Sequence, residues 1–71
     1  MNNRDRANSA KNALDVFIDE TCLEDEDLDT AIADLLCSLQ HLARQNDIDF
    51  LECQERADRN YATEIQDDDD L

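Results

Sequence analysis

Three cysteines and one histidine are the residues of this chain whose types could hold a metal ion. Cys22, Cys37, His41 and Cys53 make a Cys3His set, which is a zinc-binding composition. Cys37 and His41 are four residues apart, so one helix could present both to an ion. At ~100° per residue they lie nearly opposite the leucine stripe of their helix, whereas Cys53 is expected to face inward. We therefore expect Cys53 in the core, Cys37 and His41 on the surface, no bound metal and no cofactor.

His41 is also a candidate general base. A general base needs a nucleophile and an orienting acid in a common pocket. Asp34 is seven residues back along the chain, roughly two helical turns away. Nothing else in the sequence designates a pocket, and we expect that the protein is not an enzyme.

Alternating acids at Asp25, Asp27 and Asp29 have the spacing that begins a calcium-binding loop. The EF-hand pattern also needs a glycine at its sixth position and a glutamate at its twelfth. Counted from Asp25, these positions hold Thr30 and Leu36. The calcium-loop pattern therefore fails, and we expect only weak, nonspecific screening by cations.

Acidic residues dominate the composition, with 20 Asp and Glu against six Lys and Arg and a formal net charge of −14. Self-repulsion of this size destabilises a compact state, so the charge is not expected to serve stability. Nucleic-acid phosphates would be repelled, which excludes direct binding of DNA or RNA. Eight of the acids form a stretch without any base, here called the acidic block: Asp15, Asp19, Glu20, Glu24, Asp25, Glu26, Asp27 and Asp29.

Two interpretations of the acidic block remain open. It can be solvated surface that keeps the protein soluble. Alternatively, carboxylates three or four residues apart on a helix lie about 5–6 Å from each other, which is of the order of phosphate spacing along a nucleic-acid strand. The rows Asp15–Asp19 and Glu20–Glu24–Asp27 would then attract a basic cleft that normally binds nucleic acid.

The chain contains no glycine and no proline, which predicts an all-α fold. These residues make turns and interrupt helices, and their absence leaves few means of building a tight β-hairpin. No apolar run approaches the 18 residues of a membrane span. The first six residues are polar and are not followed by the apolar region of a secretory signal. The odd number of cysteines fits a reducing compartment. We expect a cytoplasmic protein.

Apolar spacings of three and four residues predict three helices. The first covers residues 4–20, with Asn3 as N-cap. The second covers residues 27–45 and ends at Asn46 in the left-handed region. The third covers residues 50–64 and is capped by Asp49. Their expected inward residues are Ala7, Ala10, Leu14, Phe17 and Ile18 in the first helix, Leu28, Ile32, Leu35, Leu36, Leu39, Leu42 and Ala43 in the second, and Phe50, Cys53, Ala57 and Tyr61 in the third.

Residues 1–65 are expected to form a single small domain, a helical hairpin plus a first helix. Residues 66–71 are expected to be a disordered acidic tail. A chain of this size buries only about 60% of its unfolded surface, so its core is marginal. Additional stabilisation must come from helix propensity or from a second subunit, and both a monomer and a homodimer remain open.

The segment at residues 34–64 resembles a recurrent segment in small uncharacterised proteins of phages, plasmids and other bacterial mobile elements. The resemblance implies a mobile-element context and no particular activity. It covers less than half of the chain and rests on ten matching positions: Asp34, Leu35, Leu36, Leu39, His41, Asp49, Phe50, Ala57, Tyr61 and Glu64.

We expect a noncatalytic, acidic binding protein. Its expected partner is a basic protein, and its expected role is to inhibit a nucleic-acid-handling complex such as a host defence nuclease by resembling nucleic acid, with the acidic block as binding surface. The alternative is a small self-associating structural or regulatory adaptor whose acidity serves only solubility. Neither interpretation involves a membrane.

Overall fold

A computed structural model describes residues 2–66, which form three α-helices and no strand. The helices are α1 (Asn3–Thr21), α2 (Leu28–Gln45) and α3 (Phe50–Gln66). The all-α prediction is confirmed, and every helix ends within two residues of its predicted boundary. Gln66 belongs to α3, whereas the rest of the predicted tail, residues 67–71, lies outside the described residues.

The ends of α1 are set by local hydrogen bonds. Asn2, one residue before the predicted cap, accepts a hydrogen bond on its side-chain oxygen from the backbone N–H of Asp5, at 2.8 Å. At the other end Cys22 adopts the left-handed conformation, with φ 59° and ψ 42°. Cys22 and Leu23 both donate their backbone N–H to the carbonyl of Ile18, which closes the helix.

The turn between α2 and α3 differs in detail from the prediction. Asn46 has φ −113°, so the expected left-handed stop at this residue is wrong, and Asp47 takes the positive φ of 55° instead. The Asn46 side chain donates to the carbonyl of Leu42 at 2.9 Å and so satisfies an end-of-helix acceptor. Asp49 caps α3 as predicted, because its carboxylate accepts from the backbone N–H of Glu52 at 3.3 Å.

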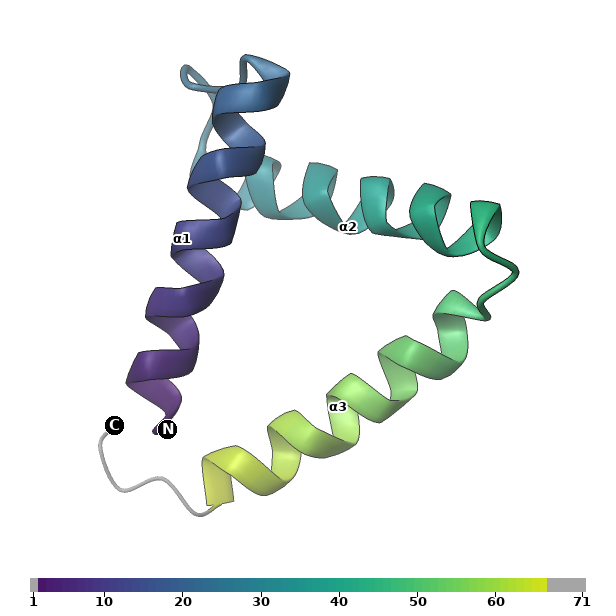
Figure 1. Ribbon diagram of the computed structural model, residues 1–71. Helices are drawn as coiled ribbons and strands as arrows, with labels where there is room; N and C mark the ends of the chain where they lie inside the picture. The colour runs from purple at the N-terminus through teal and green to yellow at the C-terminus, as the bar shows by residue number, and fades with distance from the viewer. Residues whose placement is uncertain (1, 67–71) are drawn as a thin grey trace.

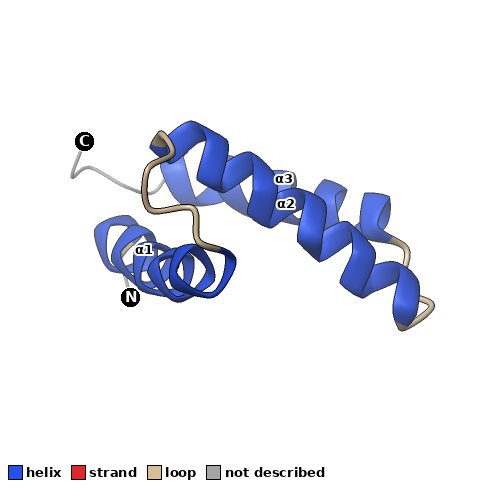
Figure 2. Ribbon diagram, turned by 90° about the horizontal axis from the view of Figure 1, so that it is seen from above, coloured by secondary structure: helices blue, strands red, loops and turns tan. Residues whose placement is uncertain are grey.

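The three helices form the sides of an open triangle (Figure 1). The helix α1 crosses the start of α2, and α3 leaves the other end of α2. Seen from above, α1 lies end-on beside the overlapping α2 and α3 (Figure 2). The molecule measures 35 × 31 × 17 Å, and its radius of gyration is 13.8 Å. A compact domain of this length would have a radius of gyration of about 11 Å.

The predicted leucine core of α2 is wrong. The buried residues of the described chain are Leu14, Ala31 and Ala43. Leu39 and Leu42, which we expected to face inward, are 40% and 56% exposed. The physical reason is the open geometry, because the helices meet closely only near the corners and diverge between them.

The apolar face of α3 is also less covered than predicted. Phe50 is half-buried beside the turn, but Cys53 and Ala57 are exposed and Tyr61 is 64% exposed. The predicted core position of Cys53 is therefore wrong. Phe50, Cys53 and Ala57 line an open groove between α3 and α2.

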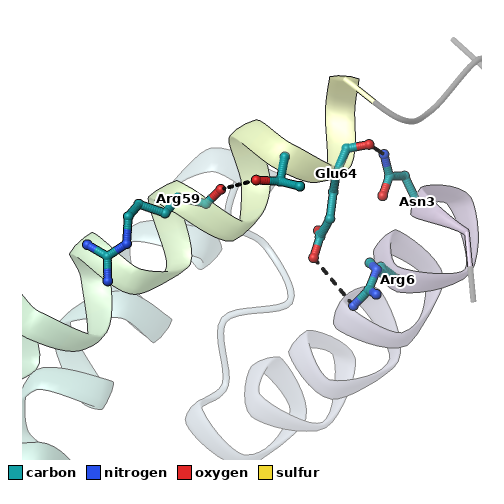
Figure 3. A network of polar contacts seen from close by, with 5 residues as sticks. Asn3, Arg6, Arg59 and Glu64 are labelled. Atoms are coloured by element: carbon teal, nitrogen blue, oxygen red, sulfur yellow. Dashed lines mark hydrogen bonds and ion pairs between the residues drawn. The ribbon is translucent and has the colours of Figure 1, made fainter.

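Polar contacts to Glu64 close the third corner (Figure 3). The Asn3 side chain donates to the backbone carbonyl of Glu64 at 3.0 Å. The Arg6 guanidinium lies 3.6 Å from the Glu64 carboxylate. An ion pair this exposed contributes about 0–1 kcal/mol, so this corner is weakly held.

Candidate protein-binding surface

The acidic block lies at the corner where α1 meets α2 (Figure 1). Three of its members, Asp15, Asp19 and Glu20, are on the last turns of α1. The next three, residues 24–26, are in the linker. Asp27 is the N-cap of α2, and Asp29 lies in the first turn of that helix. All eight side chains are exposed, so the fold gathers them at one end of the molecule and leaves them accessible.

Few carboxylates of the acidic block form a hydrogen bond or ion pair within residues 2–66. Asp15 pairs with Lys11, at 2.7 Å between the carboxylate and the ammonium, and is the one block member that forms an ion pair within residues 2–66. Asp29 accepts from the backbone N–H of Thr30 at 2.9 Å. The remaining charge of the block is thus available to a partner.

Some members of the acidic block stabilise their helix through its dipole, and others destabilise it. Asp27 and Asp29 lie at the positive end of α2, where acids are favourable. Asp19 and Glu20 lie in the last turn of α1, which contains no base, and there they oppose the negative end of the dipole. Each such contact costs about 0.3–1 kcal/mol, so helix stability gives no reason for these two acids.

Only one of the two predicted carboxylate rows is helical. Asp15 and Asp19 are four residues apart within α1 and share a face. The predicted row Glu20–Glu24–Asp27 is wrong, because α1 ends at Thr21 and the chain then turns. Glu24 therefore stands in the linker and does not continue the spacing of the helix.

The three cysteines and the histidine lie in different parts of the three-helix structure. Cys37 and His41 are exposed and line a shallow depression beside the turn between α2 and α3. Cys53 lines a separate groove between these helices, and Cys22 ends α1. Within residues 2–66 no three His, Cys, Asp or Glu side chains are grouped so that they could hold a metal.

The depression beside His41 contains one acid, which is Asp49. Asp34, the acid we considered as an orienting group, is not part of its lining. None of the hydrogen bonds of residues 2–66 involves the imidazole, and the carboxylate of Asp49 already caps α3. Within residues 2–66 the arrangement therefore gives His41 no orienting partner, although the Cys37 thiol lines the same depression.

The structure has exposed apolar grooves, whereas sequence analysis predicted that their residues would be buried. One groove between α1 and α2 is lined by Ala7, Ala10, Lys11, Leu14, Leu28, Ile32 and Leu35. A second, between α2 and α3, is lined by Leu36, Leu39, Phe50, Cys53, Gln54, Ala57 and Asp58. The sequence of the first helix could have indicated this exposure, because alanines at positions 7 and 10 are too small to cover the leucines opposite them.

Fold and surface together define a small all-α protein of three helices with an exposed acidic corner. Within residues 2–66, no helix combines the length and apolar character that crossing a membrane requires. Comparison of the chain with protein-family models, curated proteins and solved structures found no match. The resemblance to proteins of phages and plasmids therefore stays a prediction.

Proposed function

We propose that the protein is a noncatalytic inhibitor that binds the basic, nucleic-acid-binding surface of another protein. It acts in the cytoplasm, and a bacterial host defence complex is the kind of target that a phage- or plasmid-borne protein would encounter. The main support for the proposal is the position of the acidic block at the corner between α1 and α2. Its carboxylates are exposed, and Asp19 and Glu20 stand where they weaken their own helix.

The corner suits electrostatic recognition. A concentrated charge of one sign attracts an oppositely charged cleft over distance and raises the association rate by about 10–1,000-fold. The attraction weakens as salt shortens the screening length to about 8 Å at physiological ionic strength. Binding is therefore expected to be fast and strongly dependent on salt.

A second function is favoured by a different observation. The α2 leucines remain half-exposed, as expected of a small self-associating adaptor in which acid serves solubility alone. The two functions differ in their salt dependence, because association through apolar surface does not weaken as salt rises.

The experiment that tests the proposal captures partners from bacterial lysate at low and at high salt. We expect nucleic-acid-binding proteins to be retained at low salt only. Each captured protein is then bound to labelled duplex DNA or to RNA, and the chain is added as competitor. Displacement of the nucleic acid supports the proposal, whereas capture without displacement contradicts it.

Charge reversal identifies the surface responsible. Asp19→Lys combined with Glu20→Lys is expected to lower the association rate roughly tenfold or more, while relieving the unfavourable dipole contact. The matched control, Glu55→Lys with Asp58→Lys on the exposed surface of α3, changes the net charge equally. Deletion of residues 67–71 is expected to matter less than the reversal. Equal losses in reversal and control, or loss on deletion alone, would rule out the corner as the recognition surface.

A further inference from the structure

The apolar residues of α2 repeat with the spacing of a coiled-coil seam. Successive intervals of four, three, four and three residues separate the five members, here called the α2 seam: Leu28, Ile32, Leu35, Leu39 and Leu42. This is the a/d pattern of two heptads, which places all five side chains on one narrow stripe. Such a stripe packs against another helix that presents a similar one.

The helices of the same chain cover the flanks of this stripe, half-bury Leu35 and leave the other four members exposed. Ala31 and Ala43 are buried at opposite ends of α2, and twelve residues place them about 120° apart around the helix axis. The α2 seam lies between these two flanks. Leu28 and Leu42 are more than half exposed, and Ile32 and Leu39 nearly so.

The chain exposes more surface than a compact monomer of its mass. The chain exposes 5919 Å², whereas a folded monomer of 8.2 kDa exposes roughly 4,500 Å². The difference is roughly 1,400 Å² over the whole molecule, and a standard protein interface covers about 800 Å² on each partner. Residues 2–66 contain three buried residues, two of them alanine, which is less apolar burial than a stable domain needs.

We infer that a second copy of this chain covers the α2 seam, in a two-fold dimer whose α2 helices run antiparallel. The occupant must be present whenever the chain is folded, and a second copy always is. The charge distribution agrees, because α2 carries two acids and one base, the fewest charged side chains of the three helices. This inference does not depend on the binding proposed for the acidic block.

Charge also selects the antiparallel orientation. In a parallel pair, the two acidic corners would lie side by side and the helix dipoles would repel. In an antiparallel pair the corners lie at opposite ends of α2. Its 18 residues span about 27 Å at 1.5 Å per residue, which is about three screening lengths at physiological salt. Both acidic blocks thus remain free and far apart.

The first test measures the mass of the full chain in solution by sedimentation equilibrium. We expect twice 8.2 kDa at physiological salt. Leu39→Glu is expected to abolish the dimer, whereas the control Gln40→Glu, with the same added charge on the exposed surface of α2, is expected to retain it. A single-chain mass at every concentration would overturn the inference. The inference would also be overturned if the chain were a monomer that gained helix only after addition of a synthetic Lys/Leu amphipathic peptide. In that case a foreign basic helix, and not a second copy, would cover the α2 seam.

Disulfide trapping tests the orientation without any need to disrupt folding. The three native cysteines, all exposed, are first replaced by serine. Chains carrying Leu28→Cys are then mixed with chains carrying Leu42→Cys and oxidised. The antiparallel dimer predicts cross-links between the two kinds of chain. Cross-links within each kind indicate parallel pairing, and no cross-links indicate no seam contact; either result would contradict the proposed dimer.

Discussion

At the scale of single residues, the chain makes two left-handed turns without glycine. Cys22 has φ 59° and Asp47 has φ 55°. Aspartate tolerates this region because its short polar side chain bonds locally, but cysteine has no such compensation. The two positions therefore differ in the strain they contain, although their φ angles are nearly equal.

Replacing the residue in the first of these turns is expected to stabilise the fold. Cys22→Gly should raise the free energy of unfolding by about 0.5–1 kcal/mol, because relief of the left-handed strain exceeds the entropy that glycine loses on folding. Asp47→Gly should gain less. Urea unfolding followed by circular dichroism measures both, and an equal or larger gain at Asp47 would contradict the difference in strain.

At the scale of helices, small residues decide where two helices can touch. Ala31 is buried near the start of α2, where α1 crosses, and Ala43 is buried at the other end, next to the turn into α3. The carbonyl of Ala43 also accepts the backbone N–H of Ile48 at 2.9 Å, which brings the turn against the helix. A larger side chain at either position would hold the helices apart.

Enlarging the buried alanine tests this contact. Ala31→Leu is expected to cost about 1–3 kcal/mol of unfolding free energy, because the site has no room for three more carbon atoms. Ala33→Leu, an exposed position on the same helix, is the control and should change stability by less than about 0.5 kcal/mol. Equal effects of the two substitutions in thermal unfolding would show that the α1–α2 crossing is not close-packed.

At the scale of the whole molecule, the weak contact between α1 and α3 determines how far apart these two helices lie. The helix α1 meets α3 through Asn3, Arg6 and Glu64, whereas the other two corners are also held by chain connectivity and buried alanine. Because the α1–α3 contact is polar and exposed, we expect it to open at little cost. Opening would widen the access to the α2 seam.

Removal of the ion pair tests the role of this corner. Glu64→Gln, which keeps the backbone acceptor for Asn3, is expected to change stability by less than about 1 kcal/mol. It should nevertheless broaden the distance distribution between spin labels on Ser9 and Asn60, measured with labelled chain diluted in unlabelled chain. Glu52→Gln, which removes an ion pair within α3, is the control. An unchanged distance distribution in the Glu64 variant would mean that contacts other than the Arg6–Glu64 ion pair fix the distance between α1 and α3.

Local interactions explain what the sequence by itself determined. The absence of glycine and proline, the apolar periodicity and the cap at Asp49 act within a few residues, and they predicted all three helices closely. The exposed acidic block was equally predictable, because charged side chains avoid burial. The cap at Asn2 and the positive φ of Asp47 were missed by one residue each, since neighbouring polar side chains compete for the same role.

Only the tertiary structure decided which apolar residues are covered. The spacing of the α2 seam is the same whether Leu39 packs inside its own chain or against another one, so periodicity alone could not distinguish a core from an interface. That choice depends on the angles between helices. Those angles are set where Leu14 and the alanines at positions 31 and 43 are buried. The same angles place Cys53 in a different groove from Cys37 and His41.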